Sequence, residues 1–517
     1  MGNERFSKIF TASVNGLDID MVTVETDLTT GLPAFNLVGL PGSAVRESKE
    51  RVRAAIINSG YEFPLRRITV NLSPADTRKD GSHLDLPIAI GILAGFVRNE
   101  ICLPAAGRTA FLGELSLDGK INRSDLVVAM ALGLKEHGID HIFLPADNLE
   151  DVRTLPGLFF YPANELSEVV DHILGIDGIR PIQGHPGDNS AADEHKIEDD
   201  FFEVKGQESA KRALLIACCG GHDISLVGPP GVGKSMLAKC VPGIMPPLNE
   251  DECREVTRIH SIAGKMRSGR GLITTRPFRS PHHTATGAAI MGGGSRPRPG
   301  ELSLAHRGVL FMDELPEFAR NTLDMMRQPL EDRFIDLSRV GFKGRYPCDF
   351  ILITAMNPCP CGYFGDPNHE CRCTENQRQK YMFKVSGPLL DRIDMHIRLG
   401  SVKSDEIFIN EQTQGKMNSC MSSEEMRKEV LRTREIQRSR NGGALNARLK
   451  GRVTEKICRI DDEAEKILRD AYARFSMSVR SRTKVLKVAR TIADLSGADS
   501  ISVSHIAEAL AYRRPIG

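Results

Sequence analysis

The stretch 224–235 constrains the fold of this chain more than any other feature. Its first four residues are mostly apolar and predict a buried strand, and Lys234 begins a run typical of a helix. Between them lies the turn of the pattern G-x-x-x-x-G-K-[ST], in the strand-loop-helix context that a phosphate loop requires. Backbone N–H groups and the helix N-terminus of such a loop bind a polyphosphate. We therefore predict a nucleoside-triphosphate site formed by Gly228, Pro229, Pro230, Gly231, Val232, Gly233, Lys234 and Ser235.

Two acidic residues are predicted to complete this site. The run 308–314 is an apolar strand that ends in Asp313 and Glu314, which is the Walker B pattern. Lys234 should contact the β- and γ-phosphates, and Ser235 and Asp313 should bind Mg²⁺. We predict that Glu314 orients and deprotonates the attacking water.

A third apolar strand, 350–355, ends just before Asn357. A polar side chain at the tip of a strand between the two Walker strands can hold the attacking water near the γ-phosphate. We predict this role, called sensor 1, for Asn357. The alternative is that Asn357 only begins a turn with Pro358.

Length and composition limit the classes of protein that this chain can belong to. The 517 residues predict two to four domains, and 41% hydrophobic with 26% charged residues is ordinary for a soluble globular protein. A net charge of +1 argues against a uniformly basic surface, so any nucleic-acid binding must depend on local patches. The chain has no long apolar run and no signal-peptide pattern at its start. We expect a cytoplasmic protein without a membrane partner.

The order of strand-like and helix-like runs divides the chain into four parts. Residues 1–175 alternate strands at 21–25, 68–72, 109–113 and 141–144 with helices at 43–59 and 86–97, which predicts an α/β domain with its own core. Residues 176–200 are rich in acidic residues and poor in apolar ones, which predicts a flexible linker. Residues 201–400 hold the nucleotide motifs. Residues 401–517 predict a helical lid, with helices at 423–439, 461–475, 480–496 and 503–512.

Two stretches of the first domain resemble Lon-type serine-lysine proteases. The run 79–85 resembles their nucleophile segment, and 113–120 resembles the segment that leads to their catalytic lysine. The alignment places His83 at the nucleophile position, with Ser82 one place early, and Val128 at the lysine position. Valine cannot take a proton from a hydroxyl group. We expect a Lon-protease-like fold without peptidase chemistry, in which Ser82 and His83 only cap a helix.

Four of the twelve cysteines lie within fifteen residues, as Cys359, Cys361, Cys371 and Cys373. Two close pairs on a short loop can supply four thiolates to one tetrahedral Zn²⁺. A reducing compartment disfavours disulfides. We therefore predict a structural zinc site in an insertion at 357–375, with His369 as an alternative ligand.

Two inserts and the lid are candidate nucleic-acid contacts. The insert 288–298 combines glycines with arginines, and 335–346 predicts a hairpin around Gly-Phe-Lys-Gly. From residue 426 to residue 490 there are nineteen Lys and Arg against eight Asp and Glu, an excess of eleven positive charges that suits a polyanion. The alternative is that these charges are ordinary solvated surface.

The ordered set of motifs resembles AAA+ ATPases of the magnesium-chelatase and minichromosome-maintenance group. The resemblance includes the stretch 276–308 and Leu389-Leu390-Asp391-Arg392. Together with the Lon-like domain and the cysteine cluster, it makes the whole chain similar to the ComM/YifB family of Mg-chelatase-like bacterial proteins.

The resemblance implies a shared catalytic site. Arg392 would be a finger that reaches the nucleotide of a neighbouring subunit, and Arg480 a second arginine from the lid. A simple ion pair of Arg392 with Asp391 or Asp394 is the alternative. The two inserts would line the pore of a ring, with Arg296, Arg298, Lys343 and Arg345 as DNA contacts.

These observations predict an α/β protein with a Lon-protease-like N-terminal domain, an AAA+ motor carrying a zinc-binding insertion and a helical lid. By resemblance it is a hexameric, ATP-driven DNA motor that uses Mg²⁺ and migrates single-stranded or branched DNA in recombination and natural transformation, with recombination proteins as partners. The first alternative is a chelatase-type motor for metal insertion into a tetrapyrrole. The others are an ATP-dependent protease, against which Val128 argues, and a nucleotide-gated assembly scaffold, against which the intact Asp313, Glu314 and Arg392 argue.

Overall fold

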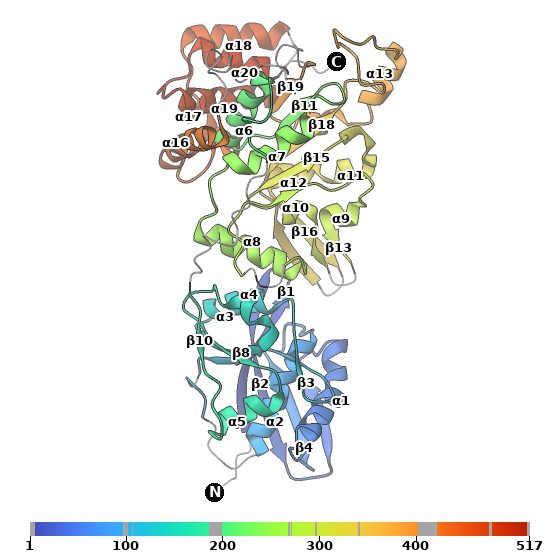
Figure 1. Ribbon diagram of the computed structural model, residues 1–517, viewed down its shortest axis with the longest axis vertical. Coiled ribbons are helices and arrows are strands. Elements are labelled where there is room, and N and C mark those ends of the chain that lie inside the picture. Colours follow the sequence, from blue (N-terminus) through green and yellow to red (C-terminus); the bar gives the residue numbers. More distant parts are fainter. Residues whose placement is uncertain are drawn as a thin grey trace.

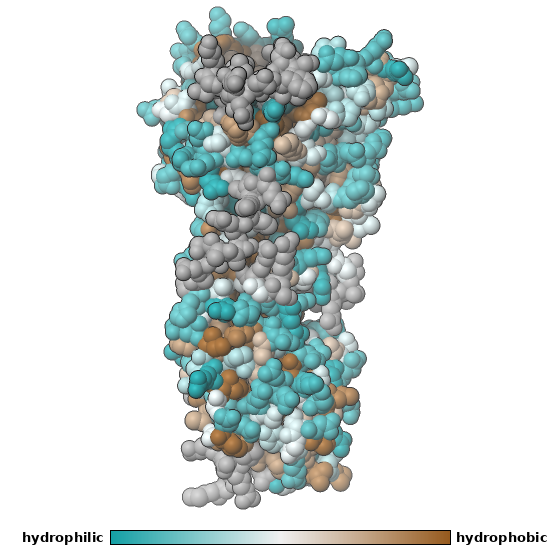
Figure 2. Space-filling view, in the orientation of Figure 1, coloured by the Kyte–Doolittle hydropathy of each residue, from teal (hydrophilic) through white to brown (hydrophobic). Residues whose placement is uncertain are grey.

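The computed structural model describes residues 6–96, 102–105, 107–185, 199–266, 269, 271–294, 297–339, 342–401, 421–474 and 478–513. The molecule is elongated, with the N-terminal domain at one end and the motor and lid together at the other (Figure 1). Within these ranges no helix is both long and apolar enough to cross a membrane. On the face drawn in Figure 2, hydrophilic residues predominate over the motor, and hydrophobic residues are scattered over the N-terminal domain.

The N-terminal domain is built on an eight-stranded mixed sheet with the order β10-β9-β8-β5-β1-β2-β4-β3. Its centre is the long antiparallel hairpin of β1 and β2, which turns at Gly16 with a positive φ of 68°. The strands are β1 (Phe6–Asn15), β2 (Asp18–Thr29), β3 (Ala34–Val38), β4 (Arg67–Ser73), β5 (Thr109–Phe111), β8 (His141–Pro145), β9 (Phe159–Ala163) and β10 (Ile182–Gln183). A separate small ribbon joins β6 (Glu114–Leu115) to β7 (Ile121–Asn122).

Helices cover both faces of this sheet and form two cores. One core contains residues of α1 (Ser43–Asn58), α2 (Asp85–Phe96) and α5 (Leu166–Ile173). The other contains α3 (Val127–Glu136) and Val152 of α4 (Leu149–Val152). Each predicted strand and helix of this domain coincides with an observed element to within a few residues. The patterns missed β1, β3, β9, α3 and α5.

Part of the predicted linker 176–200 belongs to the N-terminal domain. Residues 182–183 form β10, which pairs with β9 in an antiparallel register. The amide of Gly184 donates to the carbonyl of Leu158 at 2.8 Å, and that of His185 donates to Arg153 at 3.0 Å. The domain therefore extends to residue 185, ten residues beyond the predicted boundary.

The motor contains a five-stranded parallel sheet with the order β12-β15-β18-β11-β19. Since all strands run the same way, their carboxyl ends meet at one edge, where ligands bind in open α/β sheets. The strands are β11 (Ile224–Val227), β12 (Phe278–Arg279), β15 (Val309–Met312), β18 (Ile351–Met356) and β19 (Met395–Arg398). The helices are α6 (Glu208–Gly220), α7 (Lys234–Ile244), α8 (Glu250–Ile262), α9 (Gly287–Met291), α10 (Glu301–Leu304), α11 (Arg320–Met325), α12 (Arg327–Asp332), α13 (Glu375–Met382) and α14 (Gly387–Leu390).

The lid packs directly onto the motor. Its helices are α16 (Ser423–Asn441), α17 (Gly451–Ile457), α18 (Asp462–Arg474), α19 (Val479–Leu495) and α20 (Val503–Ala511). Val430 of α16 and Val485 of α19 share one core with Leu214 of α6 and Leu237 of α7. The four predicted helices are present, and the patterns missed the short α17.

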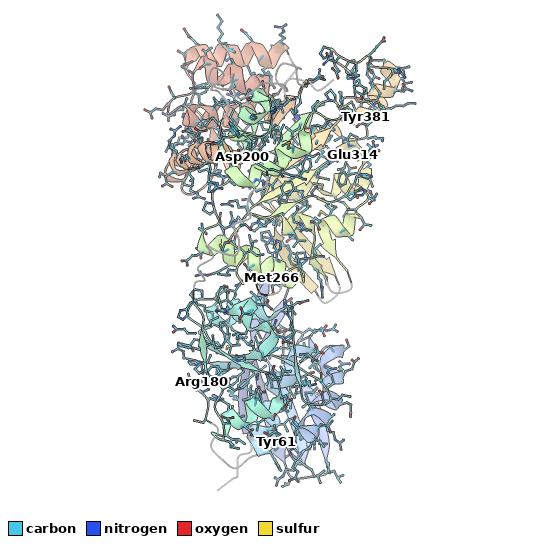
Figure 3. All side chains as sticks on the ribbon, in the orientation of Figure 1. Tyr61, Arg180, Asp200, Met266, Glu314 and Tyr381 are labelled. Atoms are coloured by element: carbon cyan, nitrogen blue, oxygen red, sulfur yellow. The ribbon has the colours of Figure 1, made fainter. Side chains whose placement is uncertain are left out.

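Helix α8 joins the motor to the N-terminal domain. Ile262 at its end lies in the same core as α3, and Met266, labelled in Figure 3, packs against that core. The hydroxyl of Ser261 donates to the carbonyl of Asp125 at 2.8 Å and accepts from the amide of Ala129 at 3.3 Å. The two domains are therefore connected by a packed and hydrogen-bonded contact as well as by the chain.

Candidate nucleotide site and cysteine cluster

The phosphate loop lies between β11 and α7, as predicted. Gly231 and Gly233 have positive φ angles of 78° and 86°, a conformation that side chains rarely adopt. Gly233 precedes the first residue of α7, so the helix N-terminus opens into the loop. Nζ of Lys234 donates to the carbonyls of Gly228 at 2.6 Å and Pro229 at 2.8 Å. The ammonium group thus lies inside the turn that would receive a phosphate.

Burial lowers the pKa of Lys234 to about 8, and the nearby Asp313 and Glu314 offset part of this effect. The cause is desolvation, because an ammonium group removed from water loses its hydration before any phosphate replaces it. The lysine is therefore held with less charge stabilisation than it would have in water.

Neighbouring strands bring the other predicted residues to this loop. Strand β18 lies between β11 and β15, so Asn357, just after β18, and Asp313, just after β15, reach the same edge. Oδ1 of Asn357 accepts from Nζ of Lys234 at 3.0 Å, and the hydroxyl of Ser235 donates to Oδ2 of Asp313 at 2.7 Å. The serine hydroxyl and the carboxylate are oxygen ligands of the kind that Mg²⁺ takes in such sites.

Glu314 occupies a strained backbone position next to this site. Its φ and ψ are 50° and 45°, in the left-handed region. Its carboxylate is 58% exposed, and Oε2 lies 3.3 Å from Nδ1 of His283. Backbone strain of this kind is found at functional sites. This contact places the His283 ring beside the predicted base.

A cleft of about 850 Å³ opens beside Glu314 and reaches the cysteine cluster and α13. Figure 3 shows the labelled Glu314 and Tyr381 on the same side of the motor. The lining residues are Glu314, Glu317, Asn357, Pro360, Cys361, Arg372, Cys373, Gln377, Lys380, Tyr381 and Lys384. Tyr381 and the basic residues of α13 had no role in the sequence prediction, because their polar helix pattern resembles ordinary surface.

Arg392 and Arg480 lie away from these residues and share one partner. Nη2 of each contacts Glu331, at 2.8 Å for Arg392 and 3.0 Å for Arg480. Arg392 does form an ion pair within the chain, as the alternative expected, but with Glu331, while Asp391 pairs with Arg513 and Asp394 with Lys484. Among the described contacts, the two arginines are joined to each other through Glu331 and to none of the nucleotide-loop residues.

The four cysteines of the insertion come together as predicted. Their sulfur atoms all lie within 4.8 Å of one another, and Sγ of Cys359 is 3.3 Å from Cys361 and 3.7 Å from Cys371. A tetrahedron with metal–sulfur distances of about 2.3 Å has edges of about 3.8 Å, which matches this cluster. Hydrogen bonding from the backbone of Tyr363 lowers the pKa of Cys361 to about 6.

The insertion contacts the phosphate loop, and the histidine alternative falls outside the cluster. A Cβ atom added at Gly362 would lie 2.7 Å from Cδ of Pro230, so the backbone of the insertion lies against the proline ring of the phosphate loop. His369 lies 3.3 Å from Asp366 and stacks on Tyr363. The residues therefore fit a Cys₄ zinc site that lies against the phosphate loop.

The two predicted inserts are adjacent elements of the motor. The first is α9 followed by the ribbon of β13 (Gly292–Gly293) and β14 (Arg298–Pro299), and the second is the hairpin of β16 (Phe334–Arg339) and β17 (Phe342–Pro347). The hydroxyl of Tyr346 donates to the carbonyl of Pro297 at 3.1 Å, which ties the inserts together. Figure 1 shows β13 and β16 at the end of the motor that faces the N-terminal domain.

The candidate DNA contacts on these inserts differ in their surroundings. Arg298 is exposed on β14. Arg345 pairs with Asp336 at 2.8 and 3.2 Å and stacks on Phe334, so its charge already has a partner. Arg296 and the side chain of Lys343 lie outside the described residues.

The basic excess of the lid does not form one surface patch. Arg434 is buried and donates to the carbonyl of Cys218, and Arg490 is buried against Asp494. Further cations that bond within the protein are Arg440 with Asp494, Arg448 with Asp349, Lys484 with Asp394 and Lys487 with the carbonyl of Ala447. Arg434, Arg448 and Lys484 therefore hold the lid on the motor, and the other three cations stabilise the lid itself, so their charges already have partners.

The protease-like residues of the N-terminal domain are bonded within the domain. The hydroxyl of Ser82 donates to the carboxylate of Glu114, and Nε2 of the buried His83 lies 3.0 Å from the carbonyl of Ala12. Val128 is 2% exposed in the core of α3. Neither Ser82 nor His83 makes the predicted cap bond, because Gly81 precedes their short 3₁₀ turn and no side chain caps it.

Three family models match successive parts of the chain. Residues 200–407 match "Magnesium chelatase, subunit ChlI", residues 24–148 match "Subunit ChlI of Mg-chelatase", and residues 420–513 match "Magnesium chelatase, subunit ChlI C-terminal". The motor, most of the N-terminal domain and the lid therefore all have counterparts in one family of AAA+ ATPases.

Relatives of similar length cover the same three parts together. The YifB protein of Salmonella typhimurium is 39% identical over 98% of this chain and 96% of its own length. The competence protein ComM of Haemophilus influenzae is 37% identical over 98% of this chain and 97% of its own. Lon protease 2 of Bacillus subtilis is 29% identical over 31% of this chain. The chain therefore belongs to the ComM/YifB family of Mg-chelatase-like AAA+ ATPases.

Proposed function

We propose that this protein is an ATP-driven DNA motor that works as a homo-oligomeric ring, hexameric by analogy with the family, on single-stranded or branched DNA. The observation that carries the proposal is the division of the catalytic residues. Hydrogen bonds join Lys234 to Asn357 and Ser235 to Asp313 at one site, whereas Arg392 and Arg480 meet elsewhere on Glu331. An arginine stabilises the charge that develops during phosphoryl transfer and can be supplied by a second protein chain.

The adjacent inserts support DNA as the substrate that moves. Their two ribbons lie together, and Arg298 is exposed on one of them. Contacts to phosphates position a protein without reading sequence, which suits a motor that travels along DNA. The name of the Haemophilus relative, a competence protein, supports natural transformation, with recombination proteins as partners, as the setting. Arg296, Arg298, Lys343 and Arg345 remain the candidate DNA contacts, of which Arg345 already has Asp336 as a partner.

We also propose that the cysteine insertion holds a structural Zn²⁺, and that the N-terminal domain is Lon-protease-like without peptidase activity. The gathering of the four sulfur atoms within 4.8 Å of one another supports the zinc site. The partial match to a Lon protease, with Val128 buried in a core, supports the second proposal. The domain then serves assembly or DNA contact.

One assay tests the main proposal. ATP hydrolysis is measured with and without forked or four-way DNA, for the natural protein and for Lys234→Ala. We expect DNA to stimulate hydrolysis and the substitution to abolish it. Lys239→Ala is the matched control, because Lys239 is exposed on the same helix. A protein that neither binds DNA nor responds to it would contradict the proposal.

A second assay tests zinc. The natural protein should contain about one zinc per chain, and Cys371→Ser with Cys373→Ser should contain almost none. Cys102→Ser is the control, since Cys102 lies exposed in the N-terminal domain. An unchanged zinc content in the double variant would exclude the site.

A chelatase-type motor is the second candidate, because the matching family models carry the name of magnesium chelatase. It predicts hydrolysis that responds to a tetrapyrrole and a partner subunit and is indifferent to DNA. The same hydrolysis assay, with a porphyrin in place of DNA, therefore separates the two functions.

A further inference from the structure

Two arginines from different parts of the fold converge on a single carboxylate. Arg392 follows α14 of the motor, and Arg480 stands in the first turn of α19 of the lid. Each oxygen of Glu331 in α12 accepts one hydrogen bond. Oε2 accepts from Nη2 of Arg392 at 2.8 Å, and Oε1 accepts from Nη2 of Arg480 at 3.0 Å. The result is a pair of guanidinium groups around one anionic group.

The convergence is fixed by the packing of α19 on the segment that carries Arg392. Nζ of Lys484 donates to the carbonyl of Arg392 and pairs with Asp394 at 2.8 Å. The hydroxyl of Ser481 donates to Asp391 at 3.1 Å. The residue after Arg480 and the residue before Arg392 are thus bonded to each other, so the lid presents its arginine beside that of the motor.

The guanidinium group of Arg392 is fixed by hydrogen bonds, but not all of its N–H donors have partners in the part of the chain that the structure describes. Its side chain is 18% exposed, Nη1 donates to the carbonyl of Pro388 at 2.9 Å, and Nε is buried with no hydrogen-bond partner among the described residues. Arg480 and Glu331 are about half exposed, at 51% and 49%. A hollow of about 500 Å³ lies beside this cluster. It is lined by residues of α11 and α12, including Glu331, and by Arg392.

Charge explains why a carboxylate is needed here. Two like charges in one place repel, and at a partly buried site the repulsion is weakly screened. A carboxylate between the two guanidinium groups offsets this repulsion and keeps both groups directed at the same position. Its two oxygens accept in the same way as the oxygens of a phosphate, which binds arginine in the same fork geometry.

We propose that Glu331 is a positioning residue that holds Arg392 and Arg480 as one clamp for the γ-phosphate of a triphosphate bound to a second copy of this chain. The proposal rests on the shared site proposed above. In the free subunit the carboxylate fills the place between the arginines. When subunits meet, the terminal phosphate of the neighbour accepts from the remaining N–H donors of both guanidinium groups, while Glu331 keeps the pair together.

The first test is Glu331→Gln, which keeps the shape and one acceptor but removes the charge. We expect kcat for ATP hydrolysis to fall about tenfold, with KM for ATP within twofold and the mass of the assembled ring unchanged. The matched control is Asp324→Asn. Asp324 lines the same hollow and pairs with Arg327 at 2.5 Å, so its loss should leave kcat within twofold. A Glu331→Gln protein with natural or raised kcat would overturn the proposal, since a raised value would make Glu331 an inhibitory latch.

Mixed rings decide in which subunit Glu331 acts. Lys234→Ala subunits keep both Arg392 and Arg480 but lack a functional phosphate loop. Arg392→Ala subunits keep the phosphate loop but lack one of the two arginines. We expect the mixture to be active where either variant alone is inactive. Glu331→Gln added to the Lys234→Ala subunits should then lower this activity about tenfold, and added to the Arg392→Ala subunits it should change it less than twofold.

The outcomes separate the two proposals. An inactive mixture would overturn the shared site, and the role of Glu331 would fall with it. An active mixture in which Glu331→Gln acts equally from either subunit would overturn only the role of Glu331, because a structural effect does not depend on which subunit supplies the arginines.

Discussion

The two α/β domains of this protein treat their polar residues in opposite ways. In the N-terminal domain, Asp85 is fully buried and pairs with Arg51 at 2.8 and 3.1 Å, while His83 and Ser82 have partners inside the domain. In the motor, Glu314 is 58% exposed and lies on a strained backbone. The protease-like polar groups of the first domain have partners inside it, whereas the Glu314 carboxylate of the motor is open to solvent.

This difference shows that a resemblance to a catalytic segment has to be judged by the partners of its residues. Burial lowers the pKa of His83, which keeps the ring neutral in a core position. Lys234, by contrast, donates its hydrogen bonds to loop carbonyls and to Asn357. These neutral acceptors bind the ammonium group less strongly than a negatively charged phosphate would. The same residue classes are therefore bonded within the core of one domain and lie at the predicted nucleotide site of the other.

The largest expected effect separates the two domains by activity. Glu314→Gln removes the predicted base, and general base catalysis contributes about 10² to 10⁴ in rate. We expect kcat for ATP hydrolysis to fall about 10³-fold, with the affinity for ATP within threefold. Ser82→Ala should leave both quantities unchanged. Steady-state hydrolysis and binding of a fluorescent ATP analogue measure them, and a loss of hydrolysis in Ser82→Ala would break the comparison.

Local patterns were sufficient to predict many of the elements and to bring the predicted nucleotide residues to one edge of the motor sheet. The phosphate loop, the two Walker carboxylates and Asn357 are each next to a strand in the sequence, so a correct strand assignment also placed the site. The hairpin at 335–346 and the cysteine cluster depend on residues close in sequence, and they too were predictable.

Contacts between distant segments were outside the reach of these patterns. Glu331 lies 61 residues from Arg392 and 149 from Arg480, and its helix looks like ordinary charged surface. The basic count of the lid was misleading for the same reason, since the buried partner of Arg434 is the carbonyl of Cys218, 216 residues away. A count of charges does not show which of them are already paired.

The second prediction concerns stability. Asp85→Ala breaks a buried ion pair and leaves Arg51 without its partner, which we expect to destabilise the N-terminal domain by about 3 kcal/mol. Arg153→Ala breaks an exposed pair with Glu150 in the same domain and should cost less than about 1 kcal/mol. Amide hydrogen exchange in α2 measures the local stability, and ATP hydrolysis by the folded motor should persist. Equal effects of the two substitutions would show that Asp85 does not anchor this core.

The smallest expected effect is a pH dependence of ATP binding that originates at Lys234. Because burial lowers the pKa of this lysine to about 8, the ammonium form predominates below that pH and the neutral amine above it. Only the charged form attracts a phosphate, so affinity should be highest at low pH and decline as the pH rises through 8. A single group with this pKa gives about threefold weaker binding at pH 8.5 than at pH 7.5.

Titration calorimetry of the natural protein and of Lys234→Ala measures this dependence. The variant should bind ATP more weakly at every pH and lose the decline around pH 8, while Lys239→Ala should keep both the affinity and the decline. If the decline in affinity persists in Lys234→Ala, another group is responsible for the titration. Lys234 would then remain charged over this pH range despite its burial.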